Sequence, residues 1–206
     1  GSFDATYDLL HGQALKSLFT LNLYLIRFQN MTVIHKLDLF DKLIEPILIY
    51  SCEIWGVNEA VKFETIHMHF CKSILGVRRQ TNNNFIYGEL GRYPLRIKRI
   101  ERVIKYWLKV VKCTSTKYVK HMYNVILQEF NMYPNRNSWA KSVKIVLENL
   151  GVYNVTWLNQ GNESLFLNMF KQRMRDNYLQ DWNNEIENSP RVTYRLFCSF
   201  GLETIT

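Results

Sequence analysis

The fold of this chain is decided by residues 95–112, which read LRIKRIERVIKYWLKVVK. Apolar side chains recur in this stretch at three- and four-residue spacing, the period of one face of an α-helix. The positions expected to pack inward are Ile97, Ile100, Val103, Ile104, Trp107, Leu108 and Val111. Pro94 stands just before the stretch, where a proline suits the first turn of a helix. The stretch therefore predicts an amphipathic helix from Leu95 to about Lys112.

The polar side of the same helix is almost entirely basic. One row of basic residues repeats at steps of four and three, and a second row with the same spacing lies beside it. The first row comprises Lys98, Arg102, Lys105, Lys109 and Lys112, and the second comprises Arg92, Arg96 and Arg99. Like charges at these spacings repel each other by about a few tenths of a kcal/mol per pair. The pattern favours an external anion that neutralises the rows, although a merely solvated face would show the same spacing.

Positive charge is concentrated around this helix. Residues 72–120 hold thirteen Lys or Arg and two acids, a net charge of +11, whereas all other residues sum to −3. Such a cluster attracts polyanions, of which phosphate backbones are the commonest. Arg78 and Arg79 add two guanidinium groups, whose shape suits phosphate. Nearby tyrosines could stack on bases or could simply pack in the core: Tyr87, Tyr93 and Tyr106.

Helical periodicity continues through the rest of the chain. Nine glycines and four prolines are too few for a many-stranded β-sandwich or barrel, and 206 residues suffice for one domain or two small ones packed together. We expect a mainly α fold, an irregular bundle of about seven to eight helices with little or no sheet. The expected helices span residues 4–29, 32–44, 59–75, 85–90, 95–112, 117–132, 138–150 and 162–186, with a kink at Pro46 and a short extended piece at 152–158.

Cysteine usage and hydropathy indicate where such a protein resides. The four cysteines (Cys52, Cys71, Cys113 and Cys198) are far apart and form no C-x-x-C pair, which favours free thiols in an intracellular protein, nuclear or cytoplasmic. The longest apolar stretch, residues 43–57, is interrupted by Glu45, Pro46 and Glu53 and is shorter than the ~20 apolar residues of a membrane span. We therefore expect no membrane contact. The opening Gly1-Ser2 is set aside as a cloning remnant.

No catalytic or metal-binding motif stands out in the sequence. His67, His69 and Cys71 lie close together, yet only His67 and Cys71 would share a helix face, and a structural zinc site needs four ligands. The glycines are isolated at expected helix ends and form no phosphate-cradling loop. Core packing is the favoured role of these residues, and we expect no metal, no cofactor and no catalytic residue.

Four motifs follow one another along the chain and, together with a later echo, spread over most of its length. The first, at residues 39–56, leads through Pro46-Ile47-Leu48-Ile49-Tyr50 into Glu53-Ile54-Trp55-Gly56. The others are His69-Phe70-Cys71-Lys72-Ser73-Ile74-Leu75-Gly76-Val77, Tyr87-Gly88-Glu89-Leu90-Gly91-Arg92-Tyr93-Pro94-Leu95 and Ile104-Lys105-Tyr106-Trp107, with a late echo at Thr193-Tyr194-Arg195-Leu196-Phe197. In this order the motifs resemble the region downstream of the palm in reverse transcriptases of non-LTR (LINE-type) retrotransposons.

The resemblance implies the thumb and post-thumb region of such a polymerase, which grips the template–primer duplex beside the palm. It implies a thumb-like helical region at residues 3–115, with the basic helix, and a post-thumb helical region at residues 116–206 packed on it. The family's palm carries an Asp-Asp motif that holds two divalent metals, and this sequence has no adjacent Asp-Asp pair. Its nearest candidates, Asp38 and Asp41, lie one turn apart on an expected helix. We therefore expect a fragment that does not polymerise DNA, from a parent that is an RNA-directed DNA polymerase.

The leading hypothesis is a non-catalytic, nucleic-acid-binding fragment that grips template or primer phosphates through its basic helix. Contacts of this kind position a duplex or strand without reading its sequence. The expected contacts are Arg78, Arg79, Arg92, Arg96, Lys98, Arg99, Arg102, Lys105, Lys109 and Lys112. The expected partners are RNA, DNA or a hybrid duplex, the remainder of a polymerase palm and, as a further option, a second copy of the chain. The alternative is a helical protein–protein interaction or assembly module derived from a retroelement, which would expose an apolar patch instead of an open basic face.

Overall fold

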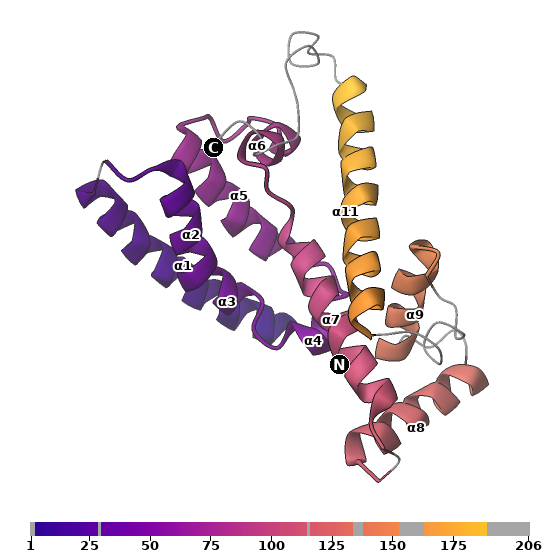
Figure 1. Ribbon diagram of the computed structural model, residues 1–206. Coiled ribbons are helices and arrows are strands. Elements are labelled where there is room, and N and C mark those ends of the chain that lie inside the picture. The colour runs from indigo at the N-terminus through magenta and orange to yellow at the C-terminus, as the bar shows by residue number, and fades with distance from the viewer. Residues whose placement is uncertain (1–2, 29, 115, 134–137, 153–162, 189–206) are drawn as a thin grey trace. The chain divides into compact units, whose positions relative to one another are not determined.

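Helices make up the described part of the chain, which comprises residues 3–28, 30–114, 116–133, 138–152 and 163–188 of a computed structural model (Figure 1). These residues form ten helices and no strand, so the prediction of a mainly α fold is confirmed. The helices are α1 (Asp4–Arg27), α2 (Val33–Leu43), α3 (Glu45–Leu48), α4 (Cys52–Trp55), α5 (Val61–Leu75), α6 (Asn83–Leu90), α7 (Leu95–Lys112), α8 (Tyr118–Met132), α9 (Trp139–Asn149) and α11 (Glu163–Glu187). None of these ten helices is long and apolar enough to cross a membrane. The extended piece expected at 152–158 falls, except for its first residue, on residues outside the described part.

Two single-turn helices, α3 and α4, account for the difference from the expected helix count. The kink expected at Pro46 is a complete break, because α2 ends at Leu43 and Pro46 stands in the first turn of α3. A proline is well tolerated there, since the first turn has no partner for its missing N–H. Ser51 then joins α3 to α4 with φ at 51°, in the left-handed region. Among the described residues it is the one non-glycine with positive φ.

The chain divides into two compact units, which we describe separately. Unit 1 comprises residues 1–50, 59–95 and 179–206, and unit 2 comprises residues 51–58 and 96–178. The chain therefore enters each unit more than once. The domain boundary expected after residue 115 separates a thumb-like from a post-thumb region by resemblance to a family. The two compact units do not test it, so it stays a prediction.

The core of unit 1 is rich in aromatic side chains. Phe40 of α2 stacks on Phe70 of α5 with ring centres 4.7 Å apart, and both rings are buried. Gly88 of α6 lies against Trp182 of α11, whose indole N–H donates to the carbonyl of Asn84 over 2.7 Å. The first helix contributes one buried row, which comprises Leu10, Ala14, Leu18 and Leu21. Aromatic rings and this aliphatic row thus fix the helices of the unit against one another.

The core of unit 2 forms around α7. Six of the seven side chains expected to face inward on this helix are buried and Val111 is half-buried, so the predicted apolar face is confirmed. A Cβ atom at Gly56 would lie 3.2 Å from both Arg99 Cβ and Val103 Cγ2, so glycine permits the close approach of α4 to α7. The buried cluster joins α7, α9 and α11 and comprises Ile100, Val103, Ile104, Trp107, Leu108, Val143, Leu147, Val152, Phe166 and Phe170.

Candidate nucleic-acid interface

A continuous row of exposed cations follows the outer face of α7. We call this row the basic stripe, and it comprises Lys98, Arg102, Lys105, Lys109 and Lys112. Arg96, the second residue of the helix, is also exposed. The opposite face of α7 is buried in the core of unit 2. These five side chains therefore point to solvent along the whole length of the helix.

Two members of the basic stripe lie close to an acidic side chain. Arg102 Nη1 lies 3.9 Å from Glu53 Oε1, and Lys112 Nζ lies 3.1 Å from Glu163 Oε2. Among the described residues, neither Lys105 nor Lys109 has a carboxylate within 4 Å. The centre of the stripe therefore keeps its positive charge.

Glu101, the one acid of α7, does not reduce this charge. Its two carboxylate oxygens lie 3.6 Å from Lys171 Nζ and 3.9 Å from Arg175 Nη2, both on α11. Glu101 therefore faces further cations instead of the lysines of the stripe.

Arg99 departs from the expected interface because it lies in the core. It is 1% exposed and shares a helix face with Val103 and Val110, which are both buried. Its guanidinium carbon lies 5.9 Å from the centre of the Trp55 ring, a cation–π arrangement within unit 2. Arg99 is not available to an external phosphate in this arrangement, so we correct its expected role to packing between α4 and α7.

Arg92 is also held inside the fold. Its side chain is 12% exposed; Nη1 donates to Asp41 Oδ2 over 3.0 Å, and Nη2 donates to the other oxygen of the same carboxylate. Nε donates to His67 Nε2 over 3.2 Å, and Glu45 Oε2 lies 3.9 Å from Nη2. Burial disfavours the charged form, but the hydrogen bonds and charge of Asp41 outweigh that cost and raise the pKa of Arg92. Its expected role in binding phosphate is corrected to a structural ion pair of unit 1.

Arg78 and Arg79 are exposed just beyond α5, in unit 1. The Arg79 guanidinium lies 3.3 Å from His69 Nε2, and its backbone carbonyl accepts a hydrogen bond from Lys72 Nζ over 2.8 Å. Burial lowers the pKa of Lys72, which is directed into the protein. These two arginines belong to unit 1 and the basic stripe belongs to unit 2, so we treat the arginines as a separate basic site.

Of the three tyrosines proposed for base stacking, Tyr106 alone lies in unit 2, beside the basic stripe. Tyr87 is buried with its ring centre 5.9 Å from that of His67, and Tyr93 is half-buried in unit 1. Tyr106 is half-buried and meets Trp139 edge to face, with ring centres 6.0 Å apart. Tyr106 is therefore the tyrosine best placed to act together with the stripe.

A hollow opens between the basic stripe and the turn that links α3 to α4. We call it the basic pocket; its volume is about 470 Å³, and it is lined by Ser51, Glu53, Ile54, Arg102, Lys105, Tyr106 and Lys109. Sequence reasoning identified its cations but missed its opposite wall. The left-handed backbone at Ser51 builds that wall, and serine gives no sequence signal for such a conformation.

A second hollow adjoins the first and is almost wholly apolar. We call it the aromatic groove; its volume is about 300 Å³, and it is lined by Ile54, Tyr106, Val110, Tyr118, Val119, Met122, Tyr123, Ile126 and Trp139. Ile54 and Tyr106 line both hollows and form their shared wall. The Trp139 indole N–H donates to the carbonyl of Glu53 over 3.0 Å, which ties the groove to the pocket wall.

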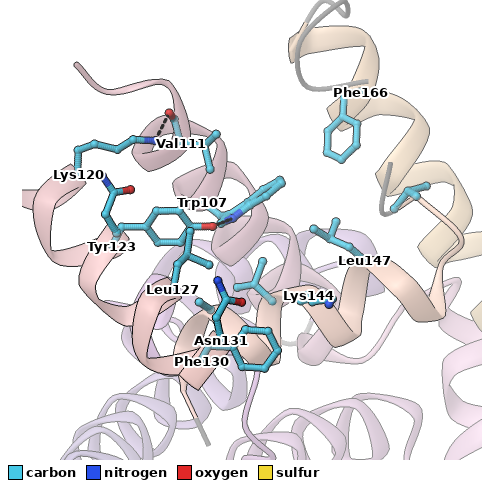
Figure 2. A pocket seen from close by; sticks show the side chains of 14 residues that line it. Trp107, Val111, Lys120, Tyr123, Leu127, Phe130, Asn131, Lys144, Leu147 and Phe166 are labelled. Carbon is cyan, nitrogen blue, oxygen red and sulfur yellow. Dashed lines mark hydrogen bonds between the residues drawn. The ribbon is translucent and has the colours of Figure 1, made fainter. Parts of the chain in front are cut away.

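A third cavity of about 380 Å³ lies inside unit 2, among side chains of α7, α8, α9 and α11 (Figure 2). Several of its polar groups already have partners within the protein. Lys120 Nζ donates to the carbonyl of Val111 over 2.6 Å, and the Trp107 indole N–H donates to the Tyr123 hydroxyl over 2.9 Å, both across this cavity (Figure 2). The two lysines that line the cavity are thus engaged, Lys120 with Val111 and Lys144 with Glu148, so this cavity suits an anion less well than the basic stripe does.

The histidines and the cysteine considered for metal binding point to different surroundings. His67 is buried beside Phe40, His69 lies on the surface beside Arg79, and Cys71 is buried. Burial raises the pKa of the Cys71 thiol to about 12, so it stays protonated at neutral pH, and only the thiolate is a good ligand. Within the described ranges, no group of three or more His, Cys, Asp or Glu side chains could hold a metal ion.

Comparison of the chain with protein-family models, with curated proteins and with solved structures finds no match. The likeness to LINE-type reverse transcriptases therefore rests on the sequence motifs alone and stays a prediction.

Proposed function

We propose that this chain is a non-catalytic, nucleic-acid-binding fragment of a reverse-transcriptase-like protein from a LINE-type retroelement. The observation that carries the proposal is the basic stripe, five exposed cations opposite a buried face of α7. At its centre, Lys105 and Lys109 have no carboxylate within 4 Å in the described part of the chain. Phosphates would supply the missing negative charge, and they would do so without reading the sequence of bases.

The proposed contact residues are fewer than the sequence suggests. In unit 2 they are Arg96 and the basic stripe, and in unit 1 they are Arg78 and Arg79. Arg92 and Arg99 are left out, because one is paired with Asp41 and the other is buried against Trp55.

Binding without polymerisation is proposed because the two aspartates nearest to the family's Asp-Asp motif are each paired with a cation. Two-metal phosphoryl transfer needs carboxylates that converge on the metal ions. Asp38 pairs with Lys42, and Asp41 pairs with Arg92, so these neighbouring aspartates each face a cation. A palm supplied by the rest of the parent polymerase is the partner that the four motifs favour.

The proposal is tested by fluorescence anisotropy with RNA, DNA and hybrid duplexes across a salt series. We expect tight binding at low salt and a linear loss of log affinity with log salt concentration. Replacing both central lysines (Lys105→Gln with Lys109→Gln) should weaken binding to all three probes and lower the salt slope by about 2.

The matched control removes two lysines from unit 1, Lys16→Gln with Lys36→Gln, and changes the net charge by the same amount. It should leave the slope unchanged, because these side chains lie on α1 and α2. An affinity that does not depend on salt, or equal losses in the two double variants, would refute contact through the basic stripe.

A second candidate function, a protein–protein interaction or assembly module, is favoured by the outer face of α1. Opposite its buried row, this helix exposes Leu15, Phe19, Leu23 and Ile26, of which Phe19 and Ile26 are each 66% exposed. Monomeric proteins rarely leave a continuous apolar row of this kind in water. The two functions are compatible, because α1 belongs to unit 1 and the basic stripe to unit 2.

A further inference from the structure

We propose that the basic pocket and the aromatic groove together bind one unpaired nucleotide of a single strand, with its phosphate in the pocket and its base in the groove. The inference rests on the proposed nucleic-acid binding and deepens it, since it makes single-stranded RNA or DNA the preferred ligand. It concerns unit 2 alone, because every residue that lines the two hollows belongs to that unit.

The two hollows are adjacent because of helix geometry. Arg102, Lys105 and Lys109 follow one row of α7 at steps of three and four, and Tyr106 and Val110 follow the neighbouring row. The first row lines the basic pocket, and Val110 of the second lines the aromatic groove. Tyr106 lines both hollows, together with Ile54 of α4. A ligand that fills both must therefore carry a negative group directly beside an apolar one.

The pocket half suits a phosphate. Lys105 and Lys109 bring two positive charges that no carboxylate among the described residues neutralises. Arg102 is already close to Glu53, at 3.9 Å, so the two lysines are the principal anion contacts. Ammonium groups on long stems can follow a phosphate of variable position.

The groove half suits a flat aromatic base. Trp139 meets Tyr106 and Tyr123 edge to face, with ring centres 6.0 and 6.3 Å away. Tyr118 is 76% exposed at the groove, and Ile54 is also exposed, so apolar surface there remains in contact with water. A nucleobase would cover this surface and stack on its rings, as bases do on aromatic side chains in single-strand binding proteins.

A continuous duplex cannot make the second contact. Its bases are stacked and paired, and turning one out has an energetic cost that an unpaired strand does not carry. A duplex can therefore use the basic stripe but not the aromatic groove, whereas a single strand can use both.

The test compares three labelled probes on the full chain at one salt concentration: a short dT strand, the same strand with abasic sites in place of its central bases, and a blunt duplex. The first two carry the same phosphates and differ only in their bases. We expect the dT strand to bind about tenfold more tightly than the abasic strand. The affinity of the duplex, divided by its number of phosphates, should be close to that of the abasic strand.

A variant pair then locates the effect. Tyr118→Ser should remove most of the tenfold preference and leave duplex binding unchanged, because this exposed side chain belongs to the groove and not to the core. Tyr133→Ser removes another exposed tyrosine, which lines none of the three hollows, and it should keep the preference.

The possible outcomes separate the inference from the proposed function. Equal affinity for the dT and abasic strands overturns the inference, and salt-dependent binding of both would leave the proposed function standing. An acidic peptide of the same charge that binds as tightly as the dT strand also overturns it, since the two hollows would then not distinguish a nucleotide from another anion. If none of the oligonucleotides binds, the inference and the proposed function both fall.

Discussion

Arg92 illustrates how burial changes what a cationic side chain can do. Its guanidinium donates to both oxygens of Asp41 and lies 3.9 Å from Glu45, which is itself buried. Lys109 carries the same charge, yet it stands exposed beside the basic pocket. The first residue stabilises unit 1, while the second remains available to an anion.

We expect Arg92→Gln to lower the free energy of unfolding by about 3 kcal/mol, because removing the guanidinium leaves the carboxylate of Asp41 without this counter-charge. Urea unfolding followed by circular dichroism measures this change. Lys109→Gln is the matched control, and it should shift stability by no more than about 0.5 kcal/mol while weakening oligonucleotide binding. The assignment is wrong if Arg92→Gln leaves stability unchanged and reduces the salt slope instead.

Two helical glycines differ in what surrounds them, and the difference matters at the scale of the element. A Cβ atom on Gly88 of α6 would lie 2.5 Å from the Trp182 ring, whereas a Cβ atom on Gly12 of α1 would meet nothing within 4 Å. Alanine is intrinsically better than glycine in a helix by about 0.8–1.0 kcal/mol. Helix propensity alone therefore predicts that alanine raises stability by the same amount at both positions. Packing predicts that alanine stabilises the protein at position 12 and destabilises it at position 88.

We expect Gly12→Ala to raise the melting temperature, since its helix gains propensity without a clash. Gly88→Ala should lower stability by about 1–3 kcal/mol, because Trp182 must move away from α6. Thermal unfolding of the two variants provides the measurement, and each serves as the control for the other. Stabilisation by both substitutions would show that Trp182 is not seated against α6.

The limits of sequence reasoning are also clear at this scale. The period of α7 predicted its length and its inward face, because a single amphipathic helix carries that information locally. The period could not predict the burial of Arg99, which depends on the close approach of α4 that Gly56 permits. It also could not predict the left-handed conformation of Ser51, which shapes the basic pocket. In α1 the apolar residues occupy two faces, so the period predicted a helix but not which face would be buried.

Across the whole molecule, the longest basic surface and the apolar row of α1 belong to different units. The basic stripe lies in unit 2, and the exposed apolar row of α1 lies in unit 1. The net charge of +8 is therefore not a general aid to solubility, since the residues outside 72–120 sum to −3. We therefore expect that substitutions in one unit can disrupt the proposed anion binding, and substitutions in the other the proposed protein contact, one at a time.

We expect the isolated chain to self-associate as its concentration rises, because the apolar row of α1 has no other partner in such a sample. Phe19→Glu should shift it to a monomer in light scattering while leaving oligonucleotide binding unchanged. Leu165→Glu, at another exposed apolar residue but on α11, is the control and should have no effect on association. A chain that stays monomeric at every concentration would argue against this use of α1.

The path of the chain has a consequence for the order in which the protein is made. Unit 1 includes residues 179–206, and Trp182 at the end of α11 packs on Gly88, which is separated from it by more than ninety residues. Unit 2, in contrast, has all of its residues once Tyr178 has been synthesised. On the ribosome, residues 4–95 of unit 1 therefore wait for Trp182 before their unit is complete. Until then the nascent protein keeps α6 uncovered, and a chaperone would find its binding surface in unit 1.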